Sequence, residues 1–336
     1  MTKKIAILVA AFAIFAPAVT AQAQQTPGKQ TAEKVLRIGW LTPAPRPWPS
    51  FREGLRELGY VEGKNFTIEF RQRKRPKSYR FLAKELVRLK VDIIVTVGAT
   101  ATHAAKQATK TIPIVMGNSS ADPVQLGLID SLARPGGNVT GVIDLLPSLA
   151  GKRMELLKEI FPSLSRIAHL RTKASKGVTP AQLKAHEAHL KATEAAASVL
   201  GVRVQGLRVT DPDDLERAFK AAVEGGAEAL IVVGTSFFIS HRARIVKLEA
   251  KYRLPTMHTH TRWVAKGGLI SYTTDVGVRY RRAAQYVDKI LKGAKPADLP
   301  VEQPTTFNLE INLKTAKALG ITIPSSILLR ATEVVE

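Results

Sequence analysis

The chain alternates between short apolar runs and longer amphipathic stretches, with Gly and Pro at many of the junctions. Apolar runs of about four to eight residues are typical of buried strands, whereas apolar residues that recur at helical spacing are typical of helices packed on one face. The runs that predict strands lie at 35–41, 66–70, 92–97, 112–116, 166–170, 202–209, 229–233 and 269–273. Helical patterns fall between them, at 51–58, 81–89, 151–161, 190–200 and 281–291. This alternation predicts parallel sheets flanked by helices.

The two halves of this pattern resemble each other. The stretch "LVRLKVDIIVTVGAT", followed by a helix and "TIPIVM", matches "AVEGGAEALIVVGTS", followed by a helix and "RLPTMH". Upstream of each, Gly59 and Gly201 occupy equivalent helix ends, where a left-handed cap favours glycine. About ten strands are too many for one compact sheet in a chain of this kind. The repeat therefore predicts two similar α/β lobes.

The first residues have the features of a secretory signal peptide. Lys3 and Lys4 precede the apolar run "IAILVAAFAIFA", and Ala21-Gln22-Ala23 supplies small residues at cleavage spacing. We predict cleavage after Ala23, a flexible start over 24–34 and export to the periplasm. No later run approaches the ~20 apolar residues that a membrane helix needs. The chain has no cysteine, so neither disulfides nor a lipid on an N-terminal cysteine is available, which favours a free periplasmic protein.

The charge is strongly basic. The formal net charge is +22, and removal of Lys3 and Lys4 with the leader gives 22 − 2 = +20. Export argues against a nucleic-acid partner, which leaves attraction of anionic solutes, an acidic membrane surface, or a general surface bias. Six basic residues fall between Arg71 and Arg80; such a run is usually a solvated loop, although a partner is an alternative.

The ends of two predicted strands carry the candidate ligand-binding loops. Ligands of open parallel sheets bind beyond the carboxyl ends of the strands. Under the repeat, Gly98-Ala99-Thr100 and Gly234-Thr235-Ser236 occupy corresponding positions, and both line one cleft if the lobes face each other. Backbone N–H groups at the helix start after Gly98, with the hydroxyls of Thr100 and Thr102, suit a carboxylate. A helix cap that holds only water is the alternative.

Six stretches of the mature chain are distinctive: "FREGLRELGYVEGKNFTIEF", "LAKELVRLKVDIIVT", "AAKQATKTIPIVM", "DPVQLGLIDSLARPGGNVTG", "GKRMELLKEIFPSLSRIAHL" and "YVDKILKGAKPADLPVEQPTTFNLEINLKTAKALGITIP". In these stretches, and over nearly its whole mature length, the chain resembles the ABC transporter substrate-binding proteins of the tryptophan/tyrosine-binding type. The resemblance implies a type I periplasmic-binding fold: two similar doubly wound parallel-sheet lobes joined by a three-stranded hinge. It also implies a receptor that closes on a small organic solute, such as an amino acid or other carboxylate.

The same resemblance implies the partners and the division of the chain. The partners are the solute, a membrane ABC permease and its separate ATPase subunit, with only peripheral membrane contact, no nucleic acid and no cofactor. The chain is expected to cross between lobes near 141–145, 272–275 and 305–307. The N-lobe then comprises 35–144 plus 275–305, and the C-lobe 145–274 plus 306–336.

Further candidate residues lie where the sequence departs from the family or at other strand ends. The proline-rich loop after Thr42 contains Arg46, which suits a solute carboxylate, and Trp48, which suits an aromatic or apolar face; an outer-surface position is the alternative for both. The remaining candidates for solute contact are Thr42, Asn118, Ser119, Phe237 and His258. Core packing is the alternative for Phe237.

His258 and His260 are predicted to alternate onto one face of a strand. Three interpretations remain open, namely packing, a solute contact and a metal site, and no third metal ligand is evident nearby. Asp122, directly before Pro123, is predicted to be the N-cap of a helix with the proline at its first position.

Enzyme motifs are missing. The chain has no G-x-S-x-G, H-E-x-x-H or phosphate-binding G-x-x-x-x-G-K-[ST] sequence and no cysteine nucleophile. A solute-binding protein that signals to a membrane receptor is one alternative, and a secreted α/β hydrolase is a weaker one.

Overall fold

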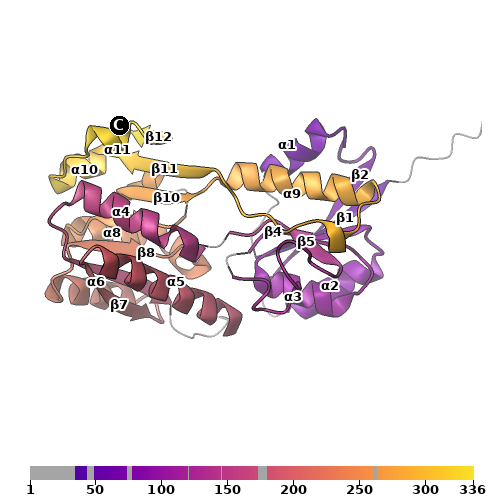
Figure 1. Cartoon of the computed structure of the whole chain (residues 1–336), viewed down its shortest axis with the longest axis horizontal. Coiled ribbons are helices and arrows are strands. Elements are labelled where there is room, and N and C mark those ends of the chain that lie inside the picture. The colour runs from indigo at the N-terminus through magenta and orange to yellow at the C-terminus, as the bar shows by residue number, and fades with distance from the viewer. Residues whose placement is uncertain are drawn as a thin grey trace, which may run out of the picture. The chain divides into compact units, whose positions relative to one another are not determined.

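The computed structural model describes residues 35–43, 49–73, 78–119, 121–144, 146–172, 180–260 and 263–336. Residues 35–336 form one compact unit that contains two separate β-sheets with helices packed on them (Figure 1). The predicted signal peptide and residues 24–34 lie outside the described residues. Among the helices of the described residues, none is long and apolar enough to cross a membrane.

The first sheet has five parallel strands in the order β2-β1-β3-β4-β5. Alternate residues of β3 point to opposite faces: Ile93 and Val95 join a core with α1 and α9, whereas Ile94 joins a core with α2 and α3. The elements are β1 (Leu36–Thr42), α1 (Pro49–Glu57), β2 (Phe66–Gln72), α2 (Tyr79–Arg88), β3 (Ile93–Val97), α3 (Ala99–Ala108), β4 (Ile114–Asn118), β5 (Val139–Gly141) and α9 (Val276–Leu291).

The second sheet has seven strands in the order β12-β11-β10-β9-β8-β6-β7, parallel except for the β10–β11 pair. Its strands are β6 (Arg166–Thr172), β7 (Arg203–Val209), β8 (Ala229–Val232), β9 (Thr256–His258), β10 (Ile270–Thr274), β11 (Phe307–Asn312) and β12 (Glu333–Val335). Its helices are α4 (Ala150–Ile160), α5 (Pro180–Val199), α6 (Asp214–Glu224), α7 (Ser236–Ser240), α8 (Arg242–Tyr252), α10 (Leu313–Leu319) and α11 (Ser325–Leu328). Short 3-10 turns are η1 (Leu146–Leu149), η2 (Val264–Lys266) and η3 (Pro296–Asp298).

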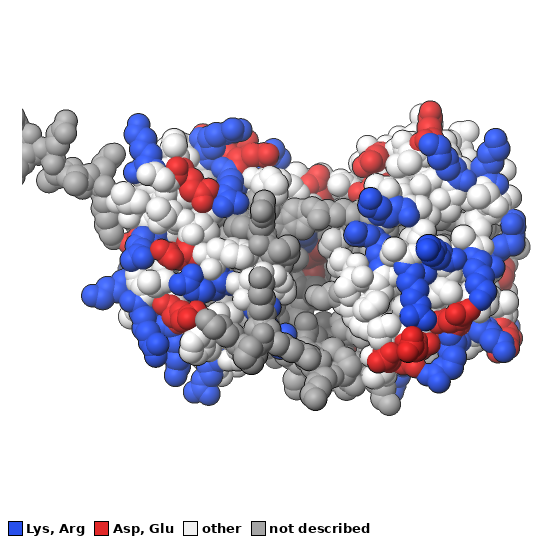
Figure 2. All heavy atoms as spheres, turned by 180° about the vertical axis from the view of Figure 1, so that it is seen from behind, with Lys and Arg blue, Asp and Glu red and all other residues white. Residues whose placement is uncertain are grey.

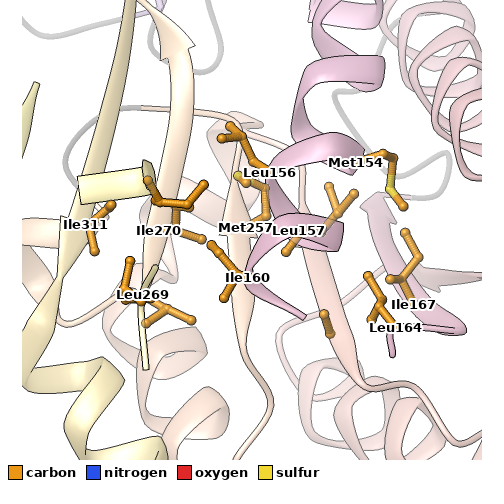
Figure 3. Close-up of a cluster of buried hydrophobic side chains, with 14 of the residues drawn as sticks. Met154, Leu156, Leu157, Ile160, Leu164, Ile167, Met257, Leu269, Ile270 and Ile311 are labelled. Carbon is orange, nitrogen blue, oxygen red and sulfur yellow. The ribbon is translucent and has the colours of Figure 1, made fainter. Parts of the chain in front are cut away.

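Helix α4 closes one face of the second sheet. Its buried side chains Met154, Leu157 and Ile160 lie against Ile167 and Met257 of the strands (Figure 3). Large side chains buried in this way each contribute about 1.5–3 kcal/mol to the free energy of folding. The core of the second lobe therefore rests on apolar packing, with no disulfide available.

The chain leaves the second sheet after β10 and returns to it as β11. Between these strands, α9 packs along α1 and belongs to the core of the first sheet (Figure 1). Gly54 permits this close approach, since a Cβ at that position would lie 3.0 Å from Ala284 Cβ. The first lobe is consequently built from two segments that are distant in the sequence.

The two-lobed α/β architecture is confirmed, with differences in detail. Gly59 and Gly201 have φ of +88° and +68°, as the predicted left-handed caps require. The sequence patterns missed β5, β11 and β12 and the antiparallel β10–β11 pair. Helix α5 begins ten residues earlier than predicted, at Pro180 instead of Leu190.

Candidate functional site

The junction between β3 and α3 is shaped by Gly98. Its φ of +89° lies in a region that side-chain-bearing residues rarely adopt, and no side chain caps the helix that follows. The Gly98 N–H donates to the Asn118 carbonyl oxygen at 2.7 Å, which joins the ends of β3 and β4. The first N–H groups of α3 therefore lie at the carboxyl edge of the sheet, where a helix N-terminus favours an anion.

The two threonines of α3 differ. Thr100 is half-buried in the first turn of the helix. Thr102 is fully buried, its hydroxyl lies 2.8 Å from the Thr96 hydroxyl, and it donates to the Gly98 carbonyl oxygen at 3.2 Å. The expectation that the Thr102 hydroxyl serves the anion site is therefore wrong, because this hydroxyl fixes the β3–α3 junction from inside.

At the end of β4, Asn118 and Ser119 also differ. The Asn118 Oδ1 atom is buried and has no hydrogen-bond partner among the described residues. Ser119 is fully buried, and its hydroxyl donates to the Ala121 carbonyl oxygen at 3.0 Å. Asp122 accepts the Val124 N–H at 2.9 Å, so it caps a turn and not a helix. Of the two candidates, Asn118 is the one whose side-chain oxygen has no partner among the described residues.

The loop after β1 is described only at its start. Thr42, the last residue of β1, is buried, and its carbonyl oxygen accepts the Arg73 N–H at 2.9 Å. Arg46 and Trp48 lie outside the described residues. The neighbouring basic stretch begins inside β2, where Arg71 pairs with Glu85 at 3.3 Å, so the expected solvated loop is partly strand.

The corresponding loop of the second lobe follows β8. Gly234 donates its N–H to the Thr259 hydroxyl at 2.8 Å, and a Cβ on Gly234 would lie 2.6 Å from His260 Cβ. Thr235 caps α7 by accepting the Phe238 N–H at 3.3 Å. Glycine is thus required here by close packing, whereas at Gly98 it is required by the backbone angle.

Phe237 and Ser236 occupy the first turn of α7. The Phe237 ring is half-buried and contacts the His241 ring at a centroid distance of 4.6 Å and the Phe238 ring at 5.3 Å. It packs against the core of the second lobe. The Ser236 side chain lies outside the described structure.

His258 is fully buried. Its ring stacks on Trp263 at 4.3 Å with 11° between the planes, and its Nε2 lies 3.3 Å from Glu249 Oε1. This environment favours the packing interpretation. Because β9 ends at His258, the prediction that His260 shares a strand face with it is wrong. The described residues contain no group of three or more His, Cys, Asp or Glu side chains able to hold a metal.

The sequence patterns missed a buried polar network in the second lobe. His169 Nε2 lies 2.9 Å from His189 Nδ1, and His189 Nε2 lies 3.3 Å from Arg153 Nη1. Arg153 Nε donates to the Tyr272 carbonyl oxygen at 2.9 Å, in the strand that leads to α9. The signal that could have revealed this network is the presence of His169 and Arg171 inside "RIAHLRT", a strand whose other interior positions are apolar and buried.

Burial sets the charge state of this network. It lowers the pKa of His169 to about 3, with a further contribution from Arg171, and it lowers the pKa of His189 well below its usual value. Burial also lowers the pKa of Arg153 to about 10. Both imidazoles are therefore neutral at physiological pH, and the arginine carries the charge.

Comparison with known proteins identifies relatives over most of the chain. A family model described as ABC transporter substrate binding protein matches residues 49–335. A tyrosine-binding protein from Clostridioides difficile is 27% identical over 273 residues, which cover 81% of this chain and 75% of the relative.

Two solved structures of similar proteins support the same family relationship. The ABC domain in complex with L-Trp from Streptococcus pneumonia is similar with a TM-score of 0.79 and 28% identity, covering 90% of this chain and all of that one. A conserved domain protein from Vibrio cholerae has a TM-score of 0.77 and 26% identity, with the same coverage. Both the sequence model and the fold point to a protein that binds a small molecule for a membrane transport system. The chain belongs to the ABC transporter substrate-binding protein family.

Proposed function

We propose that this protein is an exported receptor that binds an aromatic L-amino acid and delivers it to an ABC permease powered by a separate ATPase subunit. The observation that carries the proposal is the β3–α3 junction, where α3 begins without a side-chain cap and Gly98 is joined to Asn118 by a backbone hydrogen bond. The tyrosine and L-Trp named for two relatives supply the solute class.

The junction offers complementary groups for both charges of an amino acid. Backbone N–H groups after Gly98 suit the carboxylate, and the unpartnered Asn118 Oδ1 suits an ammonium donor. Because Gly98 and Asn118 are joined by a 2.7 Å backbone hydrogen bond, the two groups are held at neighbouring strand ends. Arg46, Trp48, Thr42 and Thr100 are proposed to complete this side of the site, and Thr235, Ser236 and Phe237 the other.

Closure of the lobes around the solute would give the permease a liganded state to distinguish from the open one. Lobe boundaries near residues 144, 275 and 305 are part of this proposal, as is cleavage after Ala23 into the periplasm. The work proposed for the chain is binding without turnover. Signalling to a membrane receptor is the alternative use of the same binding event.

Thermal unfolding with L-Trp, L-Tyr and L-Phe tests the proposal, with tryptamine and indole-3-propionate as analogues that lack one charge each. A ligand at 100 times its Kd adds about 2.7 kcal/mol to the free energy of unfolding. We expect stabilisation by at least one aromatic amino acid and a much smaller effect of both analogues. Equal stabilisation by tryptamine would contradict the carboxylate site.

Asn118→Leu separates the two halves of the site. It should weaken the amino acid at least tenfold while leaving the affinity for indole-3-propionate nearly unchanged, since that analogue has no ammonium group. Native mass spectrometry of the purified protein detects a solute already bound. If no amino acid stabilises a ligand-free preparation, the proposal fails.

A further inference from the structure

One exterior face of the first lobe is basic without compensating acidic residues. Arg80, Lys84 and Arg88 recur every four residues along α2 and are exposed, and Lys110 is exposed just beyond α3. Residues at this spacing lie on one side of a helix. We refer to these four side chains as the α2–α3 basic face.

Acidic residues are scarce around this face. Glu85, the only acidic residue of α2, pairs with Arg71 at 3.3 Å, and the ten residues of α3 include none. Within the described part of the chain, no carboxylate forms an ion pair with any of the four cations. On the face drawn in Figure 2, by contrast, Asp and Glu lie among the Lys and Arg side chains.

The face is also hollowed. Arg80, Lys84 and Lys110 line a cavity of about 340 Å³ together with Gln107 and Ala108. This volume accommodates a phosphate group, and three cations and one amide surround it with hydrogen-bond donors. Phe81, beside Arg80, leaves 45% of its surface exposed, which adds an apolar contact of the kind found at membrane interfaces.

We propose that the α2–α3 basic face binds the phosphate headgroups of an anionic phospholipid surface. A single free phosphate would use only the hollow, whereas the cations of α2 extend over about 12 Å, from Arg80 to Arg88, and match several headgroups in a plane. Without residues 1–23 the chain keeps a net charge of 22 − 2 = +20, which attracts it to such a surface, and each basic residue close to the surface strengthens binding about fivefold. Loose retention at the membrane would keep this receptor, which has no cysteine for a lipid anchor, near its permease.

Vesicle co-sedimentation of the chain lacking residues 1–23 tests this inference. The deletion removes an apolar segment that would itself bind lipid and leaves intact the compact unit of residues 35–336. Vesicles with about a third phosphatidylglycerol should retain the protein at low salt, and neutral phosphatidylcholine vesicles should not. Retention should weaken steeply at physiological ionic strength, where the Debye length is about 8 Å.

Matched triple variants show whether the face or the net charge is responsible. Arg80→Gln/Lys84→Gln/Arg88→Gln should lower the partition coefficient about 100-fold. The control, Lys247→Gln/Lys314→Gln/Lys317→Gln, removes the same charge from exposed positions of α8 and α10 and should change it less than tenfold. Equal losses would overturn the inference in favour of net charge alone.

Two further outcomes would also overturn it. Absence of binding to anionic vesicles would exclude a lipid surface, and full competition by millimolar inorganic phosphate would assign the hollow to the free ion. Solute-induced stabilisation, measured on the same variants, should match that of the unsubstituted chain. Because vesicle binding needs no solute, failure here is distinguishable from failure of the proposed receptor function.

Discussion

Arg279 and Asp144 form a buried ion pair between segments 135 positions apart in the sequence. Thr274 completes it, donating to Asp144 Oδ2 at 3.0 Å and accepting from Arg279 Nη1 at 3.0 Å. Asp144 follows the first sheet, Thr274 ends β10 and Arg279 lies in the first turns of α9. The pair therefore ties together two of the segments through which the chain passes between its sheets.

Removal of one member of this pair should destabilise the protein strongly. Asp144→Ala leaves the Arg279 guanidinium buried without its carboxylate, which should reduce the free energy of unfolding by about 3–5 kcal/mol in urea titrations. The matched control is Glu155→Ala, which removes the exposed Lys152–Glu155 pair and should cost less than about 0.5 kcal/mol. A loss below 1 kcal/mol for Asp144→Ala would contradict the role assigned to the pair.

The buried histidine pair predicts acid sensitivity. His169 and His189 bind protons far more weakly in the folded chain than in the unfolded chain, because burial lowers the pKa of both. Below pH of about 6.5 the unfolded chain gains protons that the folded one does not, so stability falls as pH falls, by up to about 1.4 kcal/mol per pH unit for each histidine. Above that pH the pair contributes no dependence.

Urea titrations between pH 7.5 and about 4.5 measure this slope. The double substitution His169→Gln/His189→Gln should flatten it, whereas substitution of the exposed His103 by Gln should leave it unchanged. Arg153, Arg171 and His186 also contact or surround the pair. Burial lowers the pKa of His186 as well, so a part of the slope should remain in the double variant. An unchanged slope in the double variant would assign the acid sensitivity to other groups.

Two glycines with positive φ should respond differently to alanine. At Gly98 a Cβ meets nothing within 4 Å, so Gly98→Ala should cost only the backbone strain, about 1–3 kcal/mol. At Gly141, with φ of +127°, a Cβ would lie 2.4 Å from the Met116 carbonyl oxygen. Gly141→Ala should therefore be the more destabilising of the two substitutions in urea titrations. The reverse order would show that the backbone of β4 and β5 can move apart at little cost in free energy.

The carboxylate site predicts losses of affinity without losses of stability. Thr100→Val and Arg46→Ala should each weaken solute binding, measured by calorimetry, while the melting temperature without solute stays within about 2 °C. Arg46 lies outside the described residues, so its role is a prediction from the sequence. Exposed Arg52→Ala, which interrupts only a surface pair with Glu62, serves as the control. Unchanged affinity in both test variants would remove the carboxylate-site model.

The sequence predicted those features of the fold that depend on residues close together in the chain. Apolar periodicity located most strands, and Gly59 and Gly201 marked helix ends because the left-handed region admits glycine at low cost. The strands β5 and β12 were missed because three residues are too few to show a clear alternation of apolar and polar positions. In such strands the pairing partner, and not the local pattern, decides the conformation.

The candidate site was predictable only in outline. The repeat located the loops at Gly98 and Gly234, yet side-chain orientation depends on tertiary contacts. Thr102 turns inward to Thr96, and the buried His258 ring stacks on Trp263. The His169–His189 contact joins β6 to α5, which no spacing rule reveals. Local sequence thus identified where the backbone turns, but not which polar atoms remain available.

The packing of α9 against α1 has a consequence for the order of events during synthesis. The strands of the first sheet end at Gly141, but the apolar surface that α9 covers stays open until residues 276–291 have left the ribosome. At about 5–20 residues per second, this delay lasts roughly 7–30 s. During that interval Trp40 and Phe51 lack part of their final packing. We therefore expect chaperones to bind preferentially to chains whose synthesis has passed residue 141 but has not yet reached residue 276.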